Sequence, residues 1–260
     1  MFDKSALVCA HPDDEILWFS SILDKIDKVI ICFMGIRSDP DCRIGRQSAL
    51  NEYPLKNISC LGLDESETFY GVDWDNPVIT EYGIEITDNK YPDRLYRENY
   101  FSLLKMLTSE LKGCLNVFTH NPWGEYGSDE HVQIYRAVTD IQKSHNFHIW
   151  FSNYVSNKSC KLMLDHMDNL NLSYIALQTN KPLAGQIQHL YQKNNCWTWY
   201  DDWQWFEDEA FLIQPFSGEK SKIPGRIVPM NFIKVPAPEK QAGHTRFSGF
   251  SLMQFLKGRS

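Results

Sequence analysis

A group of polar side chains capable of chemistry stands in the stretch AHPDDE, residues 10–15. Imidazole and carboxylate groups are zinc ligands, and a carboxylate can also take up and return a proton, so His11, Asp13 and Asp14 could serve both purposes. Alternatively, Asp13 or Asp14 simply caps a helix that begins near Glu15. A helix cap gives no role to His11. It also leaves several desolvated carboxylates that repel one another, and such a group of carboxylates usually binds a cation. The motif therefore favours a metal or catalytic site.

A zinc site that also holds a reactive water needs about three protein ligands and one open position. His11 and Asp14 would supply two ligands, so a third should come from the end of another strand. The stretch VFTHNPWGEYGSDEHVQIYRAV, residues 117–138, combines His, acidic and turn residues after a strand, and His131 falls near the start of the helix that follows. His120, at the end of that strand, could be a ligand, a donor to a ligand, or a structural residue under the loop.

The elements around these stretches predict how the side chains are brought together. Residues 5–10 and 28–34 are short, apolar, β-branched runs separated by a helix-like segment, 15–26, which is typical of a βαβ unit with parallel strands. The alternation continues, with further strands expected at 66–70, 115–119, 147–152 and 172–177, and helices near 43–57, 93–112, 129–144 and 181–194. The sequence therefore predicts an α/β fold: a Rossmann-like, doubly wound, mostly parallel sheet with helices on both faces. In such sheets ligands bind at the carboxyl ends of the strands, where AHPDDE lies.

Two segments depart from this alternation. Residues 77–92 carry alternating β-type residues around a Tyr-Gly turn, and we interpret them as a small excursion hairpin outside the main sheet. After about residue 196 the pattern is lost in a segment rich in Trp. Because 260 residues with 43% hydrophobic side chains can bury one large core, we expect a single domain over residues 1–260 with an irregular, aromatic-rich C-terminal region.

Composition and charge argue against several classes of protein. The formal charge is −7 and no run of Lys and Arg forms a stripe, which argues against nucleic acid as a partner. The seven cysteines are never spaced as C-x-x-C, which argues against a disulfide framework and a thiolate zinc site. No segment is apolar enough to span a bilayer and the N-terminus lacks a signal-peptide pattern, so we expect a soluble, cytoplasmic protein. The sequence leaves self-association into a homo-oligomer open.

Taken together, the two motifs resemble a known family of enzymes. AHPDDE after the first strand, with THNPWGEYGSDEHVQIYRAV after a later one, is similar to the PIG-L/LmbE-like family of zinc-dependent N-acetylglucosaminyl de-N-acetylases. The dipeptide LG at 61–62 and the tripeptide EAF at 209–211 also fall where related sequences often have them. The resemblance covers roughly residues 5–215.

The resemblance implies roles for individual residues. The metal ligands would be His11, Asp14 and His131. The metal would be zinc, with iron(II) as an alternative in cells, and Asp13 would be the general base. Tyr126 corresponds to a tyrosine that helps to stabilise the oxyanion in some members. Where many relatives have a His three residues before the final ligand, this chain has Ser128, so Asp13, once protonated, would also serve as the acid.

The chemistry of these residues is that of amide hydrolysis. A metal polarises the carbonyl and lowers the pKa of its bound water to about 7, and a carboxylate then takes the water's proton. We expect a metal-dependent amidohydrolase that removes an acetyl group from a small-molecule substrate, an N-acetylated amino sugar or sugar conjugate. The alternatives are a deacylase of a non-sugar amide, a protein that binds a sugar without cleaving it, and a nucleotide-binding module with Mg²⁺. For the last of these, no glycine-rich phosphate loop follows the first strand.

Residues outside the two motifs' ligands are candidates for binding the substrate. Arg37 and Arg46 follow the second strand and could pair with a phosphate or carboxylate, or be ordinary solvated arginines of a loop and a helix. Trp123, within the second motif, is a further candidate. The aromatic residues of segment 197–206 could form a wall for a sugar ring, or belong to the core or to a subunit interface.

Overall fold

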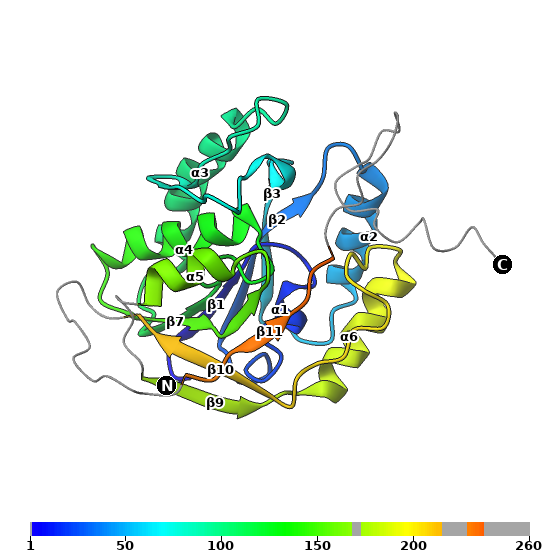
Figure 1. The fold of residues 1–260 in the computed structure, drawn as a ribbon. Coiled ribbons are helices and arrows are strands. Elements are labelled where there is room, and N and C mark those ends of the chain that lie inside the picture. Colours follow the sequence, from blue (N-terminus) through cyan, green and yellow to red (C-terminus); the bar gives the residue numbers. More distant parts are fainter. Residues whose placement is uncertain (1, 168–172, 215–227, 237–260) are drawn as a thin grey trace.

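The computed structural model of the protein describes residues 2–167, 173–214 and 228–236. Its centre is a seven-stranded sheet in the order β3-β2-β1-β6-β7-β10-β9 (Figure 1). The strands are β1 Ser5–Cys9, β2 Lys28–Gly35, β3 Ile58–Asp64, β6 Asn116–Thr119, β7 His148–Ser152, β9 Tyr174–Gln178 and β10 Asp208–Ile213. The strands from β3 to β7 in this order pair parallel, whereas β10 runs antiparallel to both β7 and β9. The predicted mostly parallel α/β sheet is confirmed.

Helices cover both faces of this sheet, as predicted (Figure 1). They are α1 Asp14–Leu17, α2 Pro40–Asn51, α3 Arg94–Glu110, α4 Asp129–Gln142, α5 Cys160–Met167 and α6 Lys181–Lys193. Successive side chains of a strand point to opposite faces, and β1 shows this clearly. Leu7 and Cys9 pack in one core with α1, α2 and α6, whereas Ala6 and Val8 pack in a second core with α3 and α4. Because β1 is buried on both faces, it has to be apolar at every position from 6 to 9.

The helix predicted over 15–26 is much shorter in the structure. The helix α1 ends at Leu17, and mostly turns follow. The Ser21 N–H donates to the Glu209 carboxylate at 2.9 Å, and the Ser20 hydroxyl donates to the same carboxylate, also at 2.9 Å. This carboxylate from β10 takes the place of helical hydrogen bonds, so a pattern local to the segment could not show where the helix ends.

Replacing Glu209 by Ala is expected to destabilise the protein. The side chain is fully buried, and its loss would leave the Ser21 N–H without an acceptor, at a cost of about 1–3 kcal/mol in the free energy of unfolding. Urea denaturation would measure the change. Glu207→Ala is the control, because this side chain is 81% exposed and pairs with Lys181 at the surface. Equal losses in both variants would contradict the proposed anchoring of this turn.

The third strand lies earlier in the chain than predicted. We expected a strand at 66–70 and a helix reaching residue 57, but α2 ends at Asn51 and the strand β3 starts at Ile58. A short 3₁₀ turn, Phe69–Gly71, stands where the strand was expected. Since β3 is an edge strand and only partly buried, its sequence ISCLGLD lacks the continuous apolar run of the inner strands.

The excursion hairpin predicted within 77–92 is confirmed, because β4 Ile79–Thr80 and β5 Gly83–Ile84 pair antiparallel. Beyond residue 196, where the sequence shows no pattern, β10 inserts between β7 and β9, and β11 Asn231–Ile233 pairs parallel with β8 Tyr154–Ser156. The single domain expected for residues 1–260 stays a prediction. Within the described ranges, no helix is long and apolar enough to cross a membrane.

Candidate metal and catalytic site

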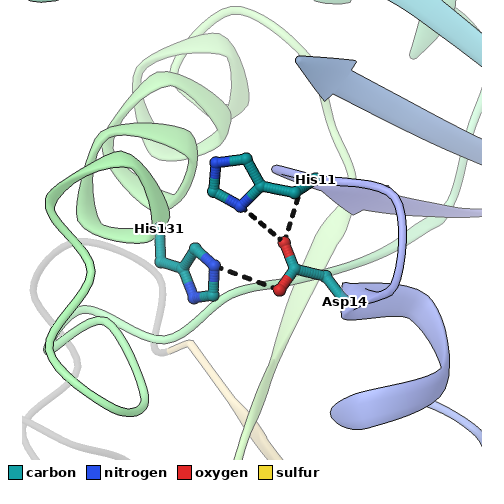
Figure 2. Close-up of side chains that lie close together, drawn as sticks. All are labelled: His11, Asp14 and His131. Atoms are coloured by element: carbon teal, nitrogen blue, oxygen red, sulfur yellow. Dashed lines mark hydrogen bonds and ion pairs between the residues drawn. The ribbon is translucent and has the colours of Figure 1, made fainter. Parts of the chain in front are cut away.

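The two predicted motifs meet at the carboxyl edge of the sheet. The strands β1 and β6 are parallel neighbours, with Val8 opposite Thr119, so the loops that follow them lie side by side. His11 comes from the loop after β1, Asp14 begins α1, and His131 lies in the first turn of α4 (Figure 2). Their candidate ligand atoms all lie within 4.8 Å of one another, and all three side chains are buried. The structure therefore brings together the three residues predicted as metal ligands.

The Asp14 carboxylate lies between the two imidazoles. Its Oδ2 is 3.2 Å from His11 Nδ1, and its Oδ1 is 3.2 Å from His131 Nε2. The second contact lacks the angle of a hydrogen bond, so the buried His131 Nε2 has no hydrogen-bond partner among the described residues. Trp18 Nε1 and the His11 backbone N–H donate to this carboxylate at 2.8 and 2.7 Å, which fixes its orientation. Two imidazole nitrogens directed at one carboxylate, one of them unsatisfied, fit the donor set of a divalent metal such as zinc.

Each of the two imidazoles meets a glutamate at its other ring nitrogen. His11 Nε2 is 2.7 Å from Glu130 Oε2, and His131 Nδ1 is 2.8 Å from Glu125 Oε2. A carboxylate in this position holds the ring proton on its own side, which directs the opposite lone pair at the ligand position. The atoms facing Asp14 are then His11 Nδ1 and His131 Nε2. No role could be predicted for either glutamate from the sequence, where the one signal is that both stand near His131 in the same motif.

Glu125 is built into the loop at some conformational cost. Its backbone has φ 46°, a conformation that residues with side chains seldom adopt, and its side chain is fully buried. Its Oε1 accepts hydrogen bonds from the Asn121 N–H at 2.9 Å and from the Ser152 hydroxyl. Burial raises the pKa of Glu125, but the imidazoles of His120 and His131 outweigh it and lower the pKa to about 2. The carboxylate is thus ionised and is a strong acceptor for the His131 Nδ1–H.

Glu125→Gln is expected to weaken metal binding by roughly 10- to 100-fold. The Asn121 N–H needs an acceptor, so the amide oxygen of the new side chain would face Asn121 and its NH₂ group would face His131 Nδ1. The ring proton would then move to Nε2, the atom that faces Asp14. Competition with a chelating dye would measure the dissociation constant for zinc, with Glu110→Gln at the surface as the control. An unchanged affinity would show that Glu125 does not set the tautomer of His131.

His120 is fully buried and packs against the ring of His131. Its Nε2 accepts a hydrogen bond from the Ala10 N–H at 2.9 Å, so its ring proton belongs on Nδ1, which lies 3.3 Å from Glu125 Oε2. Its ring stacks on that of His131, with the centroids 3.6 Å apart. Of the three roles that the sequence leaves open for His120, this geometry supports a structural one, because the lone pair of Nε2 is already engaged.

Asp13 does not cap the helix α1. It occupies the N-cap position, but its side chain makes no capping hydrogen bond and its φ is 105°. Its Oδ2 instead accepts a hydrogen bond from the Thr198 hydroxyl at 2.5 Å. Burial and the neighbouring charge of Asp14 raise the pKa of Asp13 to about 7. The capping alternative is therefore wrong for this residue, which lies beside the candidate ligands with its carboxylate turned away from the helix.

The charges around the cluster favour a cation within it. Burial raises the pKa of Asp14, but the imidazoles of His131 and His120 outweigh it and hold that pKa well below its usual value. Burial lowers the pKa of His131, but Asp14 and Glu125 outweigh it and raise the pKa to about 9. The carboxylates thus create a negative potential at the imidazoles, which a bound metal ion would neutralise.

Two small pockets adjoin the cluster, and His11 and Tyr126 line both of them. The first also contains Asp13, Asp14 and Trp199. The second is lined by the rings of Phe69 and Tyr70 and by the acidic residues Glu65, Glu67, Asp129 and Glu130. No lysine or arginine is among the described residues that line either pocket.

Tyr126 and Ser128 lie in the loop between β6 and α4. The Tyr126 ring meets that of His131 edge-on, with the centroids 5.2 Å apart. Ser128 caps α4, and its hydroxyl accepts a hydrogen bond from the His131 N–H at 3.4 Å. The residue that departs from the family pattern thus has a structural role at the start of the helix that carries His131.

The residues predicted to bind substrate lie outside both pockets. Arg37 is exposed and pairs with Asp64 at 3.2 Å. Arg46 is fully buried and pairs with Glu65. Trp123 is also fully buried, and its Nε1 donates to the Tyr154 carbonyl at 2.7 Å. Substrate binding by these three residues stays a prediction, and for the two buried ones it would need a change of conformation.

The aromatic segment, residues 197–206, lies over the start of α1. The Trp199 ring lines the first pocket and packs edge-on against Trp18 and Tyr126, with the centroids 5.3 and 4.8 Å apart. The other rings of the segment pack, partly buried, against the core that contains α1. Of the three roles left open by the sequence, the structure shows a pocket wall and part of the core, and the subunit interface stays untested.

No family model matches the sequence, and no curated protein matches it either. Similar solved structures include a deacetylase–teicoplanin complex from the biosynthesis of teicoplanin, at 11% identity over 82% of this chain and 100% of that chain, with a TM-score of 0.48. The A40926 pseudoaglycone deacetylase Dbv21 is 10% identical over 84% of this chain and 100% of its own, with a TM-score of 0.49. The zinc-inhibited form of the teicoplanin deacetylase Orf2 is 10% identical over 82% and 100%, with a TM-score of 0.47. A likeness this distant says nothing about activity, so the chemistry of this chain has to follow from its own side chains.

Proposed function

We propose that this protein is a metal-dependent amidohydrolase that removes an acetyl group from an N-acetylated amino sugar or sugar conjugate. The observation that carries the proposal is the convergence of His11, Asp14 and His131, with a buried glutamate behind each imidazole and Asp13 beside them. The choice of an acetylated amino sugar rests on the resemblance of the two motifs to the PIG-L/LmbE-like family.

His11, Asp14 and His131 would hold the metal. Two imidazole nitrogens and a carboxylate, with no thiolate, suit zinc, and iron(II) accepts the same ligands. A divalent metal bound there would act as a Lewis acid on an amide carbonyl and would make a water molecule more acidic. Glu125 and Glu130 would keep the two rings oriented toward it.

Asp13 would move the proton. Its Oδ2 is engaged by Thr198, so Oδ1 would accept the proton of the attacking water and later return it to the nitrogen of the departing amine. One water molecule is consumed, the C–N bond breaks, and acetate and an amine leave. Tyr126, which lines both pockets, would donate its hydroxyl hydrogen to the oxygen on which negative charge develops.

The second pocket suggests what the rest of the substrate looks like. Its lining contains four acidic residues, of which Glu65 pairs with Arg46, and no lysine or arginine among the described residues, so a phosphate or carboxylate would find no direct cationic partner in the lining. Neutral hydroxyl groups would instead find carboxylate acceptors and the aromatic rings of Phe69 and Tyr70. This favours a neutral sugar over the anionic substrate for which Arg37 and Arg46 were candidates.

Measurement of metal content and acetate release would test the proposed function. Purified protein is expected to contain about one zinc or iron per chain and to release acetate from at least one neutral N-acetyl sugar or glycoside. The panel should also contain a nucleotide-linked N-acetyl sugar and an N-acetyl peptide, which should be poorer substrates. A metal-free protein that gains no activity with zinc or iron(II) would refute the proposal, and preferred cleavage of the peptide would indicate a non-sugar deacylase.

A further inference from the structure

The aromatic segment brings Thr198 to Asp13, a residue 185 positions earlier in the chain. The Thr198 hydroxyl lies 2.5 Å from Asp13 Oδ2, and its backbone N–H lies 3.4 Å from the same oxygen. We propose that Thr198 is a positioning residue, which fixes the Asp13 carboxylate so that its other oxygen, Oδ1, faces the reacting water. The proposal rests on the proposed function, because it assumes that Asp13 is the base.

The backbone of Asp13 explains why its carboxylate needs such a partner. With φ 105° and ψ −26°, the residue adopts a conformation that is strained for any side chain. Its N–H donates to Glu15 Oε2 at 2.9 Å, and its carbonyl accepts from the Ile16 and Leu17 N–H groups at 3.1 and 3.0 Å. These bonds fix the backbone but leave the carboxylate outside the helix, without the capping contact that an N-cap aspartate usually makes.

Thr198 is the donor that the carboxylate does find. Among the described residues, only Thr198 donates hydrogen bonds to the Asp13 carboxylate, and both go to Oδ2. Among the described residues Oδ1 accepts no hydrogen bond, and Asp13 lines the first pocket together with His11 and Asp14, two of the three candidate metal ligands. The two oxygens thus differ in their surroundings, and Oδ1, which has no donor within the described ranges, is the one able to accept a proton from water.

The position of Thr198 does not depend on its bond to Asp13. The neighbouring Trp199 packs edge-on against Trp18 and Tyr126, and Trp205 Nε1 donates to the Ile16 carbonyl at 2.7 Å. Packing and hydrogen bonds on the C-terminal side of Thr198 therefore hold the segment over α1. Because the Thr198 hydroxyl is already in place, the Asp13 carboxylate would not have to lose conformational entropy during the reaction.

The matched variants are Thr198→Val, which keeps the shape and removes the hydroxyl, and Thr198→Ser, which keeps the hydroxyl. In the zinc-loaded protein, Thr198→Val is expected to lower kcat by roughly 10- to 100-fold, as for the loss of a hydrogen bond to a charged group. KM and metal content should stay near the wild-type values, and Thr198→Ser should restore most of kcat. Thr198→Ala, which also removes the hydroxyl, replaces the Val variant if that one does not fold.

A second comparison separates positioning from packing. The double variant Asp13→Asn, Thr198→Val is compared with Asp13→Asn alone. Its kcat should differ by less than about 2-fold, because Thr198 would act only through the Asp13 carboxylate. A Val variant with wild-type kcat would overturn the proposal. So would a Ser variant as slow as the Val variant, or a Val variant that loses its metal.

Crystal structures give a readout that does not need activity. The Asp13 carboxylate is expected to change its orientation in Thr198→Val and to keep it in Thr198→Ser. An unchanged Asp13 side chain in Thr198→Val would overturn the positioning role, whatever the kinetics. If instead the wild-type protein releases no acetate from any substrate, the proposed function fails on its own, and the Asp13 orientation still decides whether Thr198 fixes this carboxylate.

Discussion

Replacing Asp13 by Asn is expected to leave the metal bound and to lower kcat by roughly 10² to 10⁴, the usual contribution of general acid–base catalysis. Asn keeps the shape of the side chain, and its amide oxygen can still accept the hydrogen bond from Thr198. Only the ability to take a proton is lost. Because Asp13 makes no capping hydrogen bond, the helix α1 should not be affected, and the melting temperature should change little.

The comparison needs metal content, melting temperature and turnover of the same protein samples. Asp39→Asn is a suitable control, since Asp39 caps α2 through a hydrogen bond from the Cys42 N–H and Asn caps about as well. An Asp13→Asn protein that is folded, metal-loaded and fully active would refute the role of Asp13 as the base. A variant that loses its metal would mean that Asp13 is a ligand and that another group is the base.

Replacing His131 by Ala is expected to abolish metal binding and activity together. His131 supplies the buried Nε2, which has no hydrogen-bond partner in the part of the chain that the structure describes, and it is the ring that Glu125 orients and on which His120 stacks. The loss of affinity for zinc should exceed the 10- to 100-fold typical of removing a partner behind a ligand.

The control for this variant is His189→Ala, because His189 is exposed on α6 and belongs to none of the candidate metal-ligand groups among the described residues. It should keep the wild-type metal content and kcat. Zinc content by elemental analysis and acetate release would be measured for both variants. If His131→Ala bound zinc as tightly as the wild-type protein, the metal would have to lie elsewhere.

The inner part of the fold could be predicted from the sequence for a physical reason. The central parallel strands are buried over most of their length, so they carry short apolar runs, and β1, β2, β6 and β7 all lie where such runs were found. Two of the misses fall where burial is one-sided or the partner is distant, whereas the missed strand β10 is buried from Glu209 to Leu212 and lies in the segment where no pattern was found. The edge strand β3 has no continuous apolar run, and the end of α1 is set by Glu209, nearly two hundred residues away.

The candidate ligands could be predicted because each motif carries its own chemistry at the end of a strand. The residues that surround these ligands and orient them could not be predicted. Whether Glu125 reaches His131 Nδ1 depends on a loop with φ 46° at Glu125, and no local pattern encodes that conformation. Thr198 looks like any threonine in an aromatic segment, and its contact with Asp13 exists only because residues 197–206 fold back over α1. Arg46 is a candidate for binding an anion, and its burial and its pairing with Glu65 could not be predicted from the sequence.

The most direct test of the account is a crystal structure of the protein grown with zinc, with anomalous diffraction recorded on both sides of the zinc absorption edge. We expect one strong anomalous peak between His11 Nδ1, His131 Nε2 and the Asp14 carboxylate, about 2.0–2.2 Å from each. Asp13 should lie close to this peak without touching it. A zinc-loaded crystal with no peak at this position, or with Asp13 in place of Asp14 as a ligand, would contradict the assignment of the metal site.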